Sequence, residues 1–191
     1  MTWALLLEQF LNGFQLGVLL FLLAAGLTLV FGIMDLVNLA HGSLYMVGAF
    51  LCATLTQWTG SFGLGVLLAL PATMAVGVIV EMTALRTLYA RDHLDQVLAT
   101  FGLILFFNEL TRIVWGPEGM VIPLPAWLDG NVEILPGVHY PTFRMLIIAV
   151  GLGVAAALYV LVVKTRTGML IRAGASNRAM IGALGVNIKT L

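Results

Sequence analysis

Charged residues are scarce in this chain. Of its 191 residues only 9% are Asp, Glu, Lys or Arg, whereas 61% are hydrophobic. A soluble domain is about one quarter charged, and a mean hydropathy of +1.05 excludes that class. The sequence therefore predicts an integral membrane protein embedded in the lipid bilayer. It has no basic patch with interleaved aromatic residues, so we expect no nucleic-acid partner.

Cysteine and the motifs of common catalytic sites are nearly absent as well. Cys52 is the one cysteine, which leaves neither an internal disulfide nor a thiolate metal site. There is no GxxxxGK[ST] loop for nucleotide, no HExxH pair for zinc and no GxSxG elbow for a serine nucleophile. The three histidines, His41, His93 and His139, are widely separated. We expect no enzyme activity, no metal site and no cofactor in this chain.

Long apolar runs, in contrast, are abundant. A helix needs about 20 apolar residues to cross a bilayer, and we predict five spans, of which the second is short: residues 10–33, 41–58, 62–82, 97–115 and 145–163. Because Glu8 is the only charged residue before position 14, the first span is expected to be retained rather than cleaved as a signal peptide. The predicted fold class is all-α, a polytopic transmembrane helix bundle in a single domain of residues 1–191.

The positive charges orient this bundle. Seven of the nine Lys and Arg residues lie on one side of the predicted membrane, namely Arg86, Arg91, Lys164, Arg166, Arg172, Arg178 and Lys189. Only Arg112 and Arg144 border the other side. The positive-inside rule makes the first side cytoplasmic. The N-terminus then faces outward, provided that the second span is a complete crossing.

The longest segment predicted outside the membrane covers residues 116–142. It contains five of the six prolines, a density that excludes a continuous helix. We expect an irregular cap with a short hairpin. The segment is either a simple connector or a docking surface for a protein in the external or periplasmic space.

One polar stretch, residues 32–43, interrupts the apolar N-terminal region and reads GIMDLVNLAHGS. Asp35, Asn38 and His41 recur at every third position and would share one face of a helix. Polar groups at membrane depth indicate function, so these residues and Gly42 are candidates for the substrate pathway and its inner gate. A structural role is favoured near the cytoplasmic side, with Asn38 or Asp35 capping the second helix.

The fourth span carries further polar residues. Gln96, Thr100 and Asn108 form a semi-polar stripe that either lines a pathway or hydrogen-bonds to neighbouring helices, and the second case is commoner. Glu109 and Arg112 are three residues apart, which favours a local ion pair near the outer interface.

Small residues recur at a spacing of four in the first and fifth spans. Gly13 and Gly17 form one such pair, and Gly151 and Ala155 form another. This spacing lets helix backbones approach closely, so we expect a packing role.

Residues 164–191 form a predicted cytoplasmic loop that reads KTRTGMLIRAGASNRAMIGALGVNIKTL. A short helix is predicted over residues 172–184, with Ala173, Met180 and Leu184 along one side and Gly185 ending it. Such a helix lies on the membrane surface or fits a groove in a soluble partner.

Two stretches resemble a known family. GLTLVFGIMDLVNLAHGSLYMVGAF near the start and TRTGMLIRAGASNRAMIGALGVN near the end are similar to the LivH-type permease subunit of branched-chain amino acid ABC importers. The first stretch carries the NxAHG core of that family, and the second resembles its cytoplasmic coupling loop. The matching residues are Asn38, Ala40, His41 and Gly42 in the first, and Arg172, Ala173, Asn177, Met180, Leu184, Gly185 and Asn187 in the second.

The resemblance implies a multi-pass transport subunit of the bacterial inner membrane. Two permease subunits would pair, identical or different, two ABC ATPase subunits would bind beneath them, and a periplasmic substrate-binding protein would deliver substrate from above. The coupling helix would fit a cleft on the ATPase, and residues 116–142 would face the binding protein. Family permeases are longer, with further spans after the coupling loop, so the chain resembles a C-terminally truncated member.

Two questions stay open at this point. The alternative function is a stand-alone channel or secondary carrier for a small solute, for which residues 32–43 offer the candidate site. Uptake without ATP would favour that alternative. The substrate is also open between leucine, isoleucine and valine on one hand and urea, short amides or other amino acids on the other.

Overall fold

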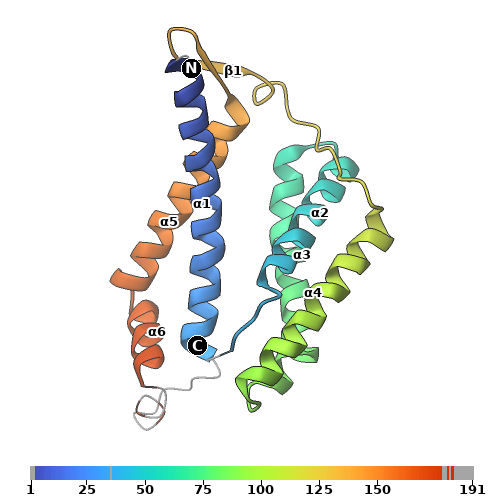
Figure 1. The fold of residues 1–191 in the computed structure, drawn as a ribbon, viewed down its shortest axis with the longest axis vertical. Coiled ribbons are helices and arrows are strands. Elements are labelled where there is room, and N and C mark those ends of the chain that lie inside the picture. The colour runs from blue at the N-terminus through green and yellow to red at the C-terminus, as the bar shows by residue number, and fades with distance from the viewer. Residues whose placement is uncertain (1–2, 35, 178–179, 181, 183–191) are drawn as a thin grey trace. The chain divides into compact units, whose positions relative to one another are not determined.

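The computed structural model describes residues 3–34, 36–177, 180 and 182 (Figure 1). The elements are α1 (Trp3–Met34), α2 (His41–Thr59), α3 (Phe62–Thr83), the 3-10 helix η1 (Leu85–Leu88), α4 (His93–Trp115), β1 (Asn131–Leu135), β2 (Val138–Pro141), α5 (Thr142–Lys164) and α6 (Arg166–Ser176). The predicted polytopic helical fold is confirmed. The chain divides into two compact units, one of Met1–Asp35 with Leu128–Leu191 and one of Leu36–Trp127.

Four of the described helices, α1, α3, α4 and α5, are long and apolar enough to cross a membrane. Helix α2 falls outside this set because His41, Thr56 and Gln57 are among the polar residues that lower its hydropathy. Its 19 residues nevertheless measure about 28 Å, close to the roughly 30 Å of a hydrocarbon core. By length, therefore, α2 can also span the bilayer.

In the first unit, α1 and α5 run parallel to each other (Figure 1). In β2, just before α5, Tyr140 is buried and its hydroxyl donates to Asn12 Oδ1 of α1 at 3.2 Å. Farther along, Gly151 lies so close to Val18 that a Cβ atom at position 151 would collide with the valine side chain. The absence of a side chain at Gly151 therefore lets the two helices touch, as the spacing of Gly151 and Ala155 predicts.

This parallel packing has a consequence for the topology. The chain leaves α1 at one end of the pair and enters α5 at the other, beside Asn12. If both helices lie in one bilayer, the segment between them crosses it an odd number of times. Since α3 and α4 are long and apolar enough for two crossings, α2 would supply the third, in agreement with the five predicted spans.

A short hairpin connects to α5 in the same unit. Strands β1 and β2 are antiparallel, with Glu133 opposite His139, and Gly137 makes the turn at φ 84°, a conformation that favours glycine. The main-chain N–H of Thr142 donates to Gly130 O at 2.8 Å and closes the base. The predicted hairpin within residues 116–142 is confirmed.

In the second unit, α2 and α3 form a helical hairpin. The turn uses Gly60 at φ 65°, and Gly65 of α3 lies against Thr56 with no room for a Cβ atom. Helix α4 packs on α2 through Trp115, whose ring stacks on Phe50 at a centroid distance of 5.2 Å and whose Nε1–H donates to Thr54 Oγ1 at 2.7 Å. Aromatic stacking and side-chain hydrogen bonds therefore hold these helices together.

Candidate functional site

The polar stretch before α2 is not helical. Helix α1 ends at Met34 and α2 begins at His41, and residues 36–38 between them form no regular element. Asn38 and His41 therefore do not share a helix face. Asp35, the third member of the predicted set, lies outside the described residues.

Asn38 forms the local hydrogen bonds of this linker. It is only 3% exposed, its side-chain Oδ1 accepts the main-chain N–H of Ala40 at 3.0 Å, and its carbonyl accepts that of His41 at 3.3 Å. Ala40 is the N-cap of α2, without a side-chain cap. The prediction that Asn38 caps α2 is wrong, because its amide closes a local Asx turn just ahead of the helix instead.

Gln96 of α4 fastens the linker to its surroundings. Its Oε1 accepts the main-chain N–H of Val37 at 3.2 Å, and its Nε2 donates to the carbonyls of Leu88 and Arg91 at 3.3 and 3.2 Å. Thr100, one turn farther along α4, donates to Val37 O at 3.4 Å. Gln96 is 2% exposed and Thr100 is fully buried, so one glutamine ties three segments together out of contact with solvent.

These contacts decide the role of the polar stripe on α4. Gln96 and Thr100 bond to neighbouring segments, as the commoner interpretation predicted, whereas Asn108 is exposed. Glu109 and Arg112 are also exposed, and neither forms an ion pair with a residue that the structure describes. The predicted Glu109–Arg112 pair is therefore wrong.

His41 and Gly42 open α2. His41 is partly buried and Gly42 is exposed, and a Cβ atom at Gly42 would meet nothing within 4 Å. Glycine is thus not required at position 42 by any contact within the described chain. The assignment of Asn38, His41 and Gly42 to a substrate pathway stays a prediction.

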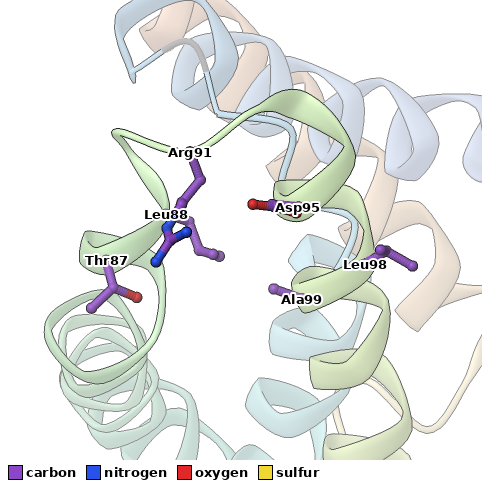
Figure 2. Close-up of a pocket in the computed structure, with 6 residues that line it drawn as sticks. All are labelled: Thr87, Leu88, Arg91, Asp95, Leu98 and Ala99. Atoms are coloured by element: carbon purple, nitrogen blue, oxygen red, sulfur yellow. The ribbon is translucent and has the colours of Figure 1, made fainter.

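A hollow of about 480 Å³ lies beside this network, between η1 and the start of α4. Figure 2 shows Arg91 and Asp95 on facing sides of it, with Thr87 below them. The bonds of Gln96 to Leu88 and Arg91 hold the two walls together. The hollow was not predicted from the sequence, although a cation and an acid four residues apart, Arg91 and Asp95, were a signal for it.

A second candidate region is the junction of α5 and α6. Thr165 caps α6, since its Oγ1 accepts the main-chain N–H of Gly168 at 3.0 Å. Arg172 donates from Nη1 to Val162 O at 2.6 Å. A Cβ atom at Gly168 would collide with the carbonyls of Leu161 and Val162. The contacts of Gly168 and Arg172 thus fix α6 to the end of α5.

Helix α6 ends earlier than the helix predicted over residues 172–184. The main-chain N–H of Asn177 donates to Ala173 O at 3.0 Å and ends α6 in an extended conformation. Asn177 Oδ1 then accepts the main-chain N–H of Met180 at 3.0 Å, a bond at the spacing that a helix N-cap uses. Met180 and Gly182 are helical. The continuous helix is therefore wrong, because α6 ends at Ser176 and Asn177 is extended.

The residues predicted to couple the chain to an ATPase lie partly in α6 and partly after it. Arg172 and Ala173 belong to α6, and Met180 follows the cap. Leu184 and Gly185, which were predicted to complete the helix, lie outside the described residues.

Together the two units define a multi-pass helical membrane protein. Residues 9–191 match the model of a family described as the branched-chain amino acid transport system / permease component. The chain belongs to this family, as the two sequence stretches predicted.

Curated relatives agree with this assignment. The chain is 31% identical over 192 residues to the high-affinity branched-chain amino acid transport system permease protein BraD of Pseudomonas aeruginosa. It is 27% identical over 193 residues to the permease protein LivH of the corresponding system in Escherichia coli K12. Each alignment covers 95% of this chain but 62% of the relative. No solved structure matches the chain.

Proposed function

We propose that the chain acts as a membrane-spanning permease subunit of an ATP-binding cassette importer for branched-chain or related amino acids, in the inner membrane of a bacterium. The observation that carries this proposal is the family match over residues 9–191. ATP hydrolysis would be performed by partner ATPase subunits, so the chain itself would not be an enzyme. A second permease subunit and a periplasmic substrate-binding protein would complete the importer.

The α5–α6 junction supports a route for coupling. In this proposal the segment that begins at Asn177, with Met180, Leu184 and Gly185, docks on an ATPase subunit. Because Gly168 and Arg172 fix α6 to α5, a displacement of the docked segment would move both helices as one piece. Position 32 of α1 lies near Ala175 of α6, with 3.7 Å between a Cβ built there and the alanine Cβ. Helix α1 would therefore follow the same movement.

The linker before α2 supports the position of an inner gate. Positive charges mark this end of α4 as cytoplasmic, and Gln96 holds the linker closed against η1. Opening of the gate would require the hydrogen bonds of Gln96 to Val37 and Leu88 to break. Asp35, Asn38, His41 and Gly42 would then line the inner end of the pathway.

The outer surface supports docking of the binding protein. Val121 and Trp127 are 83% and 69% exposed, and a hollow of about 420 Å³ lies between residues 60–63 and the stretch that ends at Trp127. Large exposed apolar side chains rimmed by polar ones mark protein contact sites. Residues 116–142 would thus meet a partner on the external side.

Reconstituted uptake tests the proposal. The protein is placed in liposomes with the second permease subunit, the ATPase subunits and ATP inside, and labelled leucine is added outside with the binding protein. Uptake should require both ATP and the binding protein. Replacing residues 174–182 with a flexible linker should abolish uptake while membrane insertion is retained. Uptake that proceeds without ATP would instead establish a channel or a secondary carrier.

A further inference from the structure

An apolar groove runs between α1 and α5 in the first unit. Its walls include Gly13, Phe14 and Gly17 of α1 and Leu152 and Ala155 of α5, and its volume is about 420 Å³. The two helices touch at Gly151 and Val18, yet a Cβ atom at Gly13 or Gly17 would meet nothing within 4 Å. The small residues of α1 therefore leave open space where the spacing of four predicted close packing.

A cation lies at one end of this groove. Arg144 is exposed, and its guanidinium donates from Nη1 to Asn12 Oδ1, one residue before Gly13. A guanidinium has five N–H donors, and no carboxylate among the described residues forms an ion pair with Arg144. Its remaining donors are therefore available to an anion, and phosphate is one that arginine binds well.

The groove has the length of one membrane leaflet. From Gly13 to Phe21 the helix rises about 12 Å, and half of a hydrocarbon core is roughly 15 Å. Lys164, Arg166 and Arg172 mark the opposite end of this unit as cytoplasmic, so the groove lies in the outer leaflet. A headgroup at Arg144 would place one acyl chain along the groove.

We propose that this groove binds an anionic phospholipid of the outer leaflet, with its phosphate on Arg144 and one acyl chain against Gly13, Gly17 and Ala155. An anionic headgroup is favoured over a zwitterionic one because Arg144 forms no ion pair with a carboxylate among the described residues. The proposal is independent of the transported substrate.

Two variants test the two halves of the site. Gly17→Leu fills the groove without a collision, since nothing lies within 4 Å of a Cβ there, and Arg144→Gln removes the charge. Gly153→Leu is the matched control for the first, because position 153 of α5 is equally open but does not line the groove. Arg112→Gln is the control for the second, an exposed arginine in the other unit.

Each protein is purified from bacterial membranes, and native mass spectrometry counts the bound phosphatidylglycerol and phosphatidylethanolamine. Wild type and both controls should retain phosphatidylglycerol preferentially. Arg144→Gln should lower its occupancy about tenfold, as expected for one lost charge-assisted hydrogen bond, and Gly17→Leu should lower it comparably. Unchanged occupancy in either variant, equal losses in the controls, or equal retention of both lipids would overturn the site.

A second copy of this chain is the competing occupant. In a Cys52→Ala background, Gly17→Cys should stay monomeric under oxidation, as should Gly153→Cys. A disulfide-linked dimer formed by Gly17→Cys alone would show that protein fills the groove, and would overturn the lipid proposal.

Discussion

The side-chain amide of Gln96 holds the main chain of Val37, with 3.2 Å between Gln96 Oε1 and the Val37 nitrogen. This bond joins a residue of α4 to the linker that precedes α2, 59 positions earlier in the chain. The linker cannot satisfy its own polar groups by helix formation. A buried polar group without a partner costs about 1–3 kcal/mol, so Gln96 replaces the hydrogen bonds that a helix would have supplied.

Substitution Gln96→Leu should therefore destabilise the second unit. It removes the partners of Val37 N–H, Leu88 O and Arg91 O at once, and we expect a loss of at least about 2 kcal/mol. The measurement is the melting temperature of purified protein in detergent. Gln57→Leu is the control, because Gln57 is exposed and makes one bond of 3.4 Å to Val121 O. Equal melting temperatures for the two variants would refute the role of Gln96.

Two glycines on α6 differ sharply in their surroundings, which gives a second prediction. A Cβ atom at Gly168 would collide with main-chain carbonyls of α5, whereas one at Gly174 would meet nothing within 4 Å. Gly168→Ala should separate α6 from α5 and so greatly reduce ATP-driven uptake, while Gly174→Ala should leave uptake within about twofold of wild type. Because alanine is a better helix former than glycine in both places, helix propensity cannot produce this difference. Uptake measured in the reconstituted importer checks it, and two equally active variants would exclude a rigid junction.

The helices were the part of the fold that the sequence predicted well. Long apolar runs have few alternatives to a membrane-spanning helix, and α3 begins at Phe62 as predicted. The hairpin around Gly137 was also predicted, since proline and glycine restrict the local backbone strongly.

The candidate sites were harder to predict, for a physical reason. The spacing of Asn38 and His41 suggested a helix face, but their linker is shaped by Gln96, far away in sequence. A partner 59 positions away leaves no periodic trace in the chain. The prediction of a continuous helix over residues 172–184 was wrong because it relied on the spacing of apolar residues. The preference of asparagine for helix ends, at Asn177, was the local signal that pointed the other way.

Asn177 provides a third prediction. Its side chain accepts the Met180 N–H at 3.0 Å, and replacing such a cap by alanine costs about 1 kcal/mol. Asn177→Ala should therefore weaken association with the ATPase subunits roughly fivefold, if the segment after Asn177 must be helical to dock. Asn177→Asp and Asn177→Ser retain an acceptor oxygen and should bind nearly as well as wild type. Binding of purified ATPase to the permease in nanodiscs measures the effect, and equal affinities for the alanine and serine variants would show that the cap is irrelevant.

The last prediction concerns α2, whose membrane crossing rests on the parallel packing of α1 and α5. If α2 spans the bilayer, its two ends lie on opposite sides of the membrane. In a Cys52→Ala background, Ser61→Cys after α2 should react with a membrane-impermeant maleimide added to intact cells, and Leu39→Cys before α2 should react only after the cells are opened. Leu39 and Ser61 are both accessible in the described chain, at least in part, so burial within the fold does not mask either site. Labelling of both positions from the same side would mean that α2 does not cross, and α1 and α5 could then not run parallel in one bilayer.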